Sequence, residues 1–218
     1  MAINKKQASP AVKAGIIVVA VMLVLAFALP LVSPSLFSGS SATPGTGESG
    51  QLETIGTQYS GTVNAYQQQL ASDPTSYTVL VGIGNTYSDW ANAILQYQGV
   101  AGGADLPVWV ASARYYERAL EVQPGDPNVG TDLAISYYYS GDIVNAIATV
   151  ETVMAANPDF PPAYFNAAIF YKAANMPGQA VAAAQTFLQL DPEGQYGNPD
   201  SARAIVDELG SAAATGTP

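Results

Sequence analysis

The sequence contains neither cysteine nor histidine, and only seven of its 218 residues are lysine or arginine. Without cysteine and histidine, the chain has no disulfides, none of the usual zinc or haem sites, and no nucleophile–histidine pair. Seventeen acidic residues give a net charge of −10, which disfavours nucleic-acid binding because phosphate contacts need clustered basic side chains. We therefore expect no enzyme, no cofactor and no nucleic-acid partner.

The few basic residues are concentrated near the N-terminus. Lys5, Lys6 and Lys13 precede or open an apolar run over residues 11–32, and no basic residue follows in the next eighty positions. A helix of about 20 apolar residues spans the hydrocarbon core of a bilayer, and flanking lysines stay on the cytoplasmic side. This pattern predicts a cytoplasmic tail at residues 1–10 and a single-pass transmembrane signal anchor at residues 11–32.

A cleaved signal peptide is the alternative interpretation of this run. Ala26, Phe27 and Ala28 offer a small-x-small cleavage site. The apolar stretch continues through residues 29–32, which makes the run long for a signal peptide and favours a retained anchor. The chain after residue 32 is then expected in the periplasm or at the cell exterior. With four basic and seventeen acidic residues, that part carries a net charge of −13, so we expect a neutral to basic partner.

Both ends of the remaining chain have linker-like compositions. Residues 33–50 mix Gly, Ser, Pro and Thr, which predicts a flexible linker, and residues 211–218 are predicted to be a disordered tail. A helical domain is expected at residues 51–210.

This domain repeats with a period of 34 residues. One unit begins at Pro127 and the next at Pro161, and both carry alanine at positions 8 and 20, tyrosine at position 11 and proline at position 32. Small residues at positions 8 and 20 let two helices cross closely, and the proline ends the second helix. The pattern resembles the tetratricopeptide repeat. The resemblance implies an all-α fold, a short solenoid of helix-turn-helix units with the position-11 tyrosines in its core.

We expect about three such units with one helix on each side. The first unit starts at Tyr77, but an insertion displaces its second helix and is expected to lengthen its first. The predicted elements are a lone helix at residues 51–71, units at residues 77–126 (with the insertion at residues 91–106), 127–160 and 161–194, and a cap helix at residues 200–209 that Gly210 closes.

The acidic residues allow two chemical alternatives. Glu117 and Glu121 lie one turn apart, each three residues after an arginine, which is typical of a solvated helix face rather than of an acid/base pair. A loop near the C-terminus groups four oxygen-bearing residues: Asp191, Glu193, Asn198 and Asp200. Their spacing does not match the 12-residue calcium loop, and such residues also form turns. We assign no catalytic residue and no metal site, and leave open whether this acidic loop binds a cation.

The resemblance also implies where a partner binds. In tetratricopeptide repeats, the first helices of the units line an inner, concave face. Carried over position by position, that face gives ten candidate partner-binding residues: Val81, Asn85, Thr131, Ile135, Tyr138, Tyr139, Phe165, Asn166, Ile169 and Lys172. They are aromatic, aliphatic and amide side chains with one base, which does not suit the grip of lysines and arginines on a peptide carboxylate. The alternative is that the flanking helices fill this face from within.

Together these features predict a membrane-anchored, extracytoplasmic repeat scaffold. It would bind a polypeptide partner during the assembly or support of a membrane or envelope protein complex. The alternatives are a permanent structural accessory subunit of a larger membrane complex, or a secreted binding protein after signal cleavage.

Overall fold

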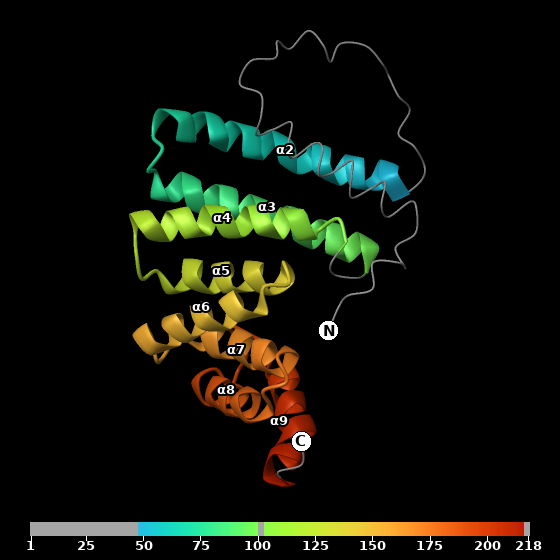
Figure 1. Cartoon of the computed structure of the whole chain (residues 1–218), viewed down its shortest axis with the longest axis vertical. Coiled ribbons are helices and arrows are strands. Elements are labelled where there is room, and N and C mark those ends of the chain that lie inside the picture. Colours follow the sequence, from blue (N-terminus) through green and yellow to red (C-terminus); the bar gives the residue numbers. More distant parts are fainter. Residues whose placement is uncertain (1–47, 100–102, 216–218) are drawn as a thin grey trace.

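The computed structural model describes residues 48–99 and 103–215. Within these ranges the chain forms eight helices and no strand, so the all-α prediction is confirmed. The helices are stacked one after another along the long axis of the molecule (Figure 1). They are α2 (Glu48–Ser72), α3 (Tyr77–Gln98), α4 (Leu106–Val122), α5 (Pro127–Tyr139), α6 (Ile143–Ala156), α7 (Pro161–Ala173), α8 (Pro177–Leu190) and α9 (Pro199–Thr215).

Several predictions about the N-terminus lie outside the described residues. These are the cytoplasmic tail at residues 1–10, the anchor at residues 11–32 and the linker up to residue 47. None of the helices from α2 to α9 combines the length and hydropathy needed to cross a bilayer.

The helices of the last two units repeat with the period read from the sequence. α5 and α7 begin at Pro127 and Pro161, and α6 and α8 show the same offset. Proline suits the first turn of a helix because the N–H that it lacks would be unpaired there. In each unit, one residue of the turn between the helices is left-handed: Gly141 at φ 87° and Asn175 at φ 59°. Glycine and asparagine tolerate this conformation best, so two different residues give the same turn.

The insertion lengthens the first unit, as predicted. α3 continues to Gln98, and α4 begins at Leu106 with a proline in its first turn. Asp105 organises the connection, because its buried carboxylate accepts the N–H of Gly103 at 2.8 Å. The pair α3 and α4 therefore extends beyond the shorter α5 and α6 (Figure 1).

Two helix boundaries differ from the sequence-based prediction. α2 begins at Glu48, inside the predicted linker, and α9 continues through Gly210 to Thr215, inside the predicted disordered tail. A glycine closes a helix where it adopts the left-handed conformation, and Gly210 does not. Within a helix glycine costs only about 1 kcal/mol, and the alanines at residues 212–214 favour continuation.

Small residues let the two helices of each unit cross closely. The residues at positions 8 and 20 of the regular pattern are all buried: Gly84, Ala134, Ala168, Ala146 and Ala180. A Cβ atom built on Gly84 would lie 2.6 Å from the ring of Tyr116. The backbone of α3 therefore lies against a side chain of α4, with no room for a larger residue.

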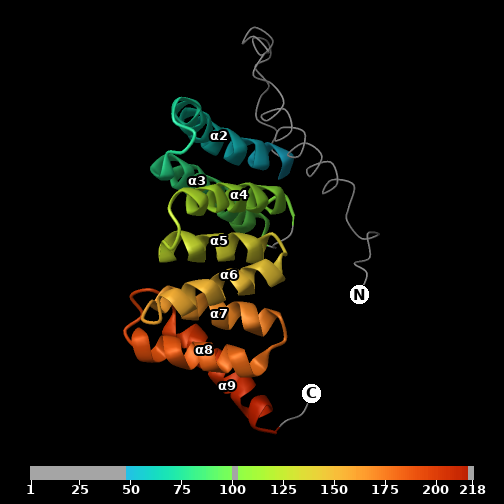
Figure 2. The same cartoon turned by 60° about the vertical axis from the view of Figure 1, so that its left-hand side comes forward.

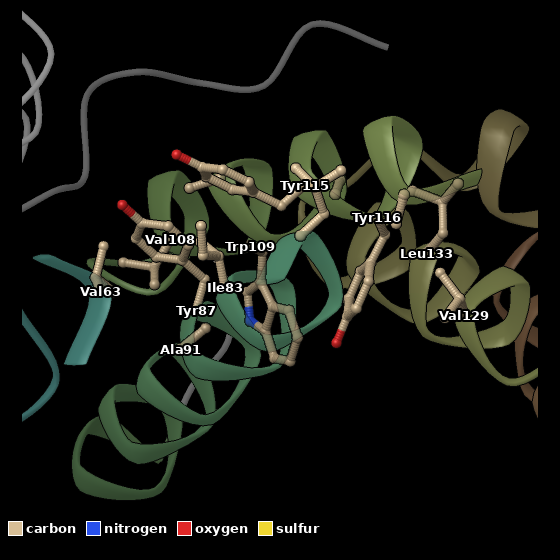
Figure 3. Close-up of a cluster of buried hydrophobic side chains, with 14 of the residues drawn as sticks. Val63, Ile83, Tyr87, Ala91, Val108, Trp109, Tyr115, Tyr116, Val129 and Leu133 are labelled. Carbon is tan, nitrogen blue, oxygen red and sulfur yellow. The ribbon is translucent and has the colours of Figure 1, made fainter. Parts of the chain in front are cut away.

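Two clusters of buried side chains form the core. The first joins α2 through α5 and the second joins α5 through α9, and Ile135 and Tyr137 of α5 pack against both. In the first cluster, Tyr87 of α3 and Val108 and Trp109 of α4 are buried side by side (Figure 3). Each large side chain buried in this way contributes about 1.5–3 kcal/mol. α5 is the helix that unites the two halves of the core.

The position-11 tyrosines tie each of the last two units to the unit before it. The hydroxyl of Tyr137 donates to the carboxylate of Glu117, and that of Tyr171 donates to Glu151 at 2.7 Å. The two pairs share one sequence spacing of 20 residues. Burial, and then the neighbouring glutamate, raises the pKa of both tyrosines above its usual value. Tyr171 is buried as predicted, and Tyr137 is half-buried.

Replacing Tyr171 by phenylalanine should lower the free energy of unfolding by about 1–2 kcal/mol. The change removes a hydrogen bond to a charged group but keeps the buried ring. Urea unfolding followed by circular dichroism at pH 7 measures this difference. The matched control is Tyr97→Phe, because Tyr97 is 42% exposed and the change should stay within about 0.5 kcal/mol. Equal stability of Tyr171→Phe and the unmodified protein would show that the tie contributes nothing.

Candidate partner-binding face

The first helices of the last two units form a layer with α9. α5 contacts α7 and α7 contacts α9, whereas among the described residues no comparable contact joins α3 to α5, α4 to α6 or α6 to α8. First helices that approach one another while second helices separate are typical of a curved helical array. Figure 2 shows the same order of stacking from a second direction. We call the solvent-facing surface of α3, α5 and α7 the inner face.

The ten predicted residues differ in their exposure. Asn85 and Lys172 are exposed, whereas Thr131 is buried, with 4% of its surface exposed. The hydroxyl of Thr131 donates to the carbonyl of Pro127 at 2.8 Å, so this side chain bonds to its own helix and does not belong to the inner face. The remaining seven are half-buried: Val81, Ile135, Tyr138, Tyr139, Phe165, Asn166 and Ile169.

The two tyrosines at the end of α5 are held in a row of aromatic rings. Tyr139 stacks on Trp109 and Tyr138 stacks on Phe170, each with 4.8 Å between ring centroids. The two tyrosines meet edge to face at 5.1 Å. Such pairs contribute about 0.5–1.5 kcal/mol beyond burial. The row therefore links α4, α5 and α7, and a substitution of either tyrosine would alter packing as well as any binding.

The C-terminal segment covers part of the inner face of the third unit. Lys172 forms an ion pair with Glu208 of α9 at 2.5 Å. Phe165 packs against Phe187, and a Cβ atom on Gly197 would lie 2.9 Å from Phe165, so the loop before α9 lies against this ring. Filling from within, the alternative left open by the sequence, thus holds at the third unit.

A group of polar side chains involves α3, α4 and α5. Tyr116 of α4 donates its hydroxyl to the side-chain oxygen of Asn85 at 2.7 Å. Burial raises the pKa of Tyr116, and the charges of Asp132 on α5 and Asp89 on α3 raise it further. Asn85 and Asp89 are exposed, and Asp132 is half-buried.

Asp132 differs from the other buried or half-buried carboxylates of the described chain in having no donor. Burial, and then the charge of Asp126, raises the pKa of Asp132 to about 6. No described residue donates a hydrogen bond to its carboxylate or pairs with it as an ion. For Asp126, partial burial is outweighed by hydrogen bonds from Tyr77, Val129 and Asn128, which lower its pKa.

Sequence reasoning did not select Asp132 or Tyr116 for the site. Asp132 follows Thr131, which was selected, and lies at position 6 of its unit, where the other units have Gly82 and Asn166. The sequence could have marked Asp132 by one feature, since no basic residue lies within one helical turn of this carboxylate.

The acidic residues of the C-terminal loop have a structural role. The two carboxylate oxygens of Asp191 accept the N–H groups of Gln195 and Tyr196 at 2.8 and 2.7 Å, and Asp191 is 4% exposed. The described part of the chain contains no group of three or more acidic residues placed to hold a metal ion. Asp191 therefore organises the turn between α8 and α9.

A shallow cavity of about 310 Å³ lies on the outer side, between α4, α5 and α6. Gly130 lines it at position 4, where the other units have Leu80 and Tyr164. A Cβ atom on Gly130 would lie 2.6 Å from Val153 Cγ2, so the side chain of Val153 occupies part of the space of the missing side chain. The cavity therefore arises because the second unit has glycine where the other units have a large side chain.

Comparison with known proteins identifies the fold. No family model matches the chain, and no curated protein matches it. The first tetratricopeptide-repeat domain of Spaghetti (RPAP3), solved with the HSP90 peptide SRMEEVD, is 19% identical, covers 65% of this chain and 96% of its own, and has a TM-score of 0.50. MamA from Desulfovibrio magneticus RS-1, from residue 41 to its end, is 12% identical, covers 76% of this chain and 94% of its own, and has a TM-score of 0.51. A double mutant of MamA RS-1 is 13% identical, with coverages of 74% and 94% and a TM-score of 0.52.

These likenesses show a tetratricopeptide-repeat fold in the described part of the chain. Identities below 20% carry no information on the ligand, and the same fold serves many functions.

Replacing Asp132 by asparagine should raise the free energy of unfolding at pH 7 by about 1–2 kcal/mol. The pKa of Asp132 is about 6 in the folded protein and about 4 in the unfolded chain, so its ionisation destabilises the fold as pH rises through this interval. The amide keeps the shape and removes the charge. Urea unfolding at pH 7 and at pH 4 measures the effect, which should be largest at pH 7.

The matched control is Asp89→Asn, which removes an exposed carboxylate from the same face and should change stability by less than about 0.5 kcal/mol. A lower free energy of unfolding for Asp132→Asn at pH 7 would contradict the conclusion that the ionised carboxylate of Asp132 destabilises the fold.

Proposed function

We propose that this chain is a membrane-anchored scaffold whose repeat domain binds a segment of a partner protein outside the cytoplasm. The open part of the inner face, on α3 and α5, carries this proposal. Val81, Asn85 and Asp89 follow at four-residue spacing along one face of α3, and Asp132 and Ile135 lie three residues apart on α5. Asn85 and Asp89 are exposed, and the other three are half-buried. A surface that combines apolar side chains with a few polar groups suits an extended or helical peptide.

The comparisons support the binding mode at the level of the fold. A domain with the same fold was solved with a bound peptide. That peptide is acidic, whereas the inner face described above presents carboxylates, so a different ligand is expected for this chain.

The sequence supports the location. The apolar run at residues 11–32 with lysines before it would hold the domain at a membrane, and the net charge of −13 after residue 32 would keep the domain in solution beside it. A scaffold in this place would act in the assembly or support of a membrane or envelope protein complex.

A second function, as a permanent structural subunit, is favoured by one observation. Glu208 and Gly197 lie against the inner face of the third unit, and the aromatic row of Tyr138 and Tyr139 is largely engaged within the domain. A domain that fills part of its own groove would contact a permanent neighbour through other surfaces.

Photo-crosslinking in native membranes distinguishes these functions. We would place benzoylphenylalanine at Thr78, which is exposed at the start of α3 and occupies position 2 of its unit, a position that faces inward in tetratricopeptide repeats. The exposed control is Gln68 on α2. The scaffold predicts one crosslinked partner from Thr78 and little product from Gln68, with at least a fivefold difference in yield.

Equal yields at the two positions, or product at Gln68 alone, would contradict inner-face binding and favour the structural subunit. The intact mass of the same purified protein tests the anchor, because cleavage after Ala28 would remove the N-terminal residues and contradict membrane anchoring.

A further inference from the structure

The second unit has a cavity of about 310 Å³ on its outer side, where α4 and α6 both pack on α5. Because α4 and α6 make no comparable contact with each other among the described residues, the space between them stays open over the N-terminal part of α5. Its lining includes Leu120 of α4, Gly130 of α5, and Ala148 and Val153 of α6. A volume of this size is at the lower limit of sites that hold a ligand, about 300 Å³.

The other two units show which side chain this space can hold. Position 4 is Leu80 in the first unit, where it is 1% exposed, and Tyr164 in the third, where it packs against the second core cluster. In the second unit this position is Gly130, whose Cβ would point at Cγ2 of Val153. The methyl group of Val153 takes part of the space, and the cavity is what remains. The second unit therefore leaves open the place of a leucine or tyrosine side chain.

The polar groups of the lining are engaged within the domain. Asp126 is the charged lining residue, and its carboxylate accepts the hydroxyl of Tyr77 at 2.6 Å and two backbone N–H groups of α5. The hydroxyl of Thr152 and the side-chain amide of Asn157 each donate to a carbonyl of α6. The cavity thus offers a ligand mainly apolar surface, which suits an apolar group and does not suit a charged one.

We infer that this cavity is a second docking site, which takes one leucine or aromatic side chain from a neutral to basic segment of a partner protein. The inserted side chain occupies the place that Leu80 and Tyr164 occupy in the other units, and it completes the packing between α4 and α6. A single large apolar side chain buried in a pocket is the usual anchor of a protein interface. The site lies on the outer side, so it is separate from the inner face and does not depend on binding there.

Charge and position select a partner segment over other occupants. The exposed Glu121 and Asp159 lie within two residues of lining residues in the sequence, and the chain after residue 32 has thirteen more acidic than basic residues. An acidic segment or a fatty acid is therefore repelled, and a second copy carries the same excess of charge. The preceding segment of this chain enters the domain at Glu48, and α2 begins at the opposite end of the helices from the α4–α5 connection (Figure 1).

Two neighbouring alanines of α6 provide the test variants. Ala155 and Ala156 are both exposed, but Ala156 lines the cavity and Ala155 does not. Ala156→Trp should therefore fill the cavity, whereas Ala155→Trp, the matched control, should leave it open. Thr152→Phe, at an exposed lining position one turn earlier, is a second filling variant. Thermal melts confirm which variants are folded.

A displayed library of random dodecapeptides is first depleted on the Ala156→Trp protein and then selected on the unmodified full-length protein in nanodiscs. The depletion removes peptides that bind the inner face or the nanodisc, because Ala156→Trp leaves both unchanged. The remaining peptides should share one leucine or aromatic position, enriched at least fivefold over the library. Depletion on Ala155→Trp should remove these peptides as well.

A synthetic copy of the strongest peptide is then compared with a copy carrying alanine at the selected position. Fluorescence anisotropy should show at least tenfold weaker binding of the alanine copy to the unmodified protein and to Ala155→Trp. On Ala156→Trp and on Thr152→Phe the two peptides should differ by less than twofold, because the cavity that distinguishes them is filled.

Three results would count against a proposal. If no peptide survives the depletion, or if the survivors share no large apolar position, the inference is overturned and inner-face binding is left intact. Saturable binding of cis-parinaric acid that Ala156→Trp abolishes would assign the cavity to a lipid chain and overturn it as well. The peptides eluted from the depletion step report on the inner face, so their absence would contradict the proposed function alone.

Discussion

The close crossing of the two helices within each unit is the constraint on which the rest of the structure depends. Where position 8 is Gly84, the ring of Tyr116 lies against the backbone of α3, and the hydroxyl of Ser112 reaches the carbonyl of Gly84 at 2.9 Å. In the later units alanine keeps the same approach. A larger residue would push the helices apart, and because interiors are close-packed, neighbouring units would lose contacts as well. The stacking of the units and the position of the inner face both depend on this close crossing of the two helices.

The scarcity of basic residues shapes how the carboxylates are used. The described residues form two ion pairs, both exposed, and such pairs contribute at most about 1 kcal/mol each. Tyrosine hydroxyls and backbone N–H groups donate hydrogen bonds to the carboxylates instead. Glu117 and Glu151 accept tyrosines from the next unit, Asp126 and Asp142 cap helices, and Asp191 holds a loop. Hydrogen bonding thus replaces countercharge in an acidic domain.

The sequence could predict those features that repeat. The period located the helices of the last two units, the small residues at positions 8 and 20 and the lengthening of α3, because each follows from local spacing. It could not locate the end of α9, since glycine closes a helix only in one conformation and composition does not reveal that conformation. The contacts of Lys172 with Glu208 and of Tyr139 with Trp109 were also beyond it, because they join residues outside the repeated pattern. For these candidate residues, the sequence therefore predicted a place on the inner face but not the contacts that engage them within the domain.

The surroundings of Asp132 oppose the charge of its carboxylate. Every other carboxylate discussed above has a donor or is well exposed, whereas this one is partly desolvated, unpaired in the described chain and close to like charges. Such an arrangement costs folding free energy, and an asparagine of the same shape would avoid the cost. Charges without a partner in the folded protein are frequent at functional sites, where a bound molecule can provide the partner.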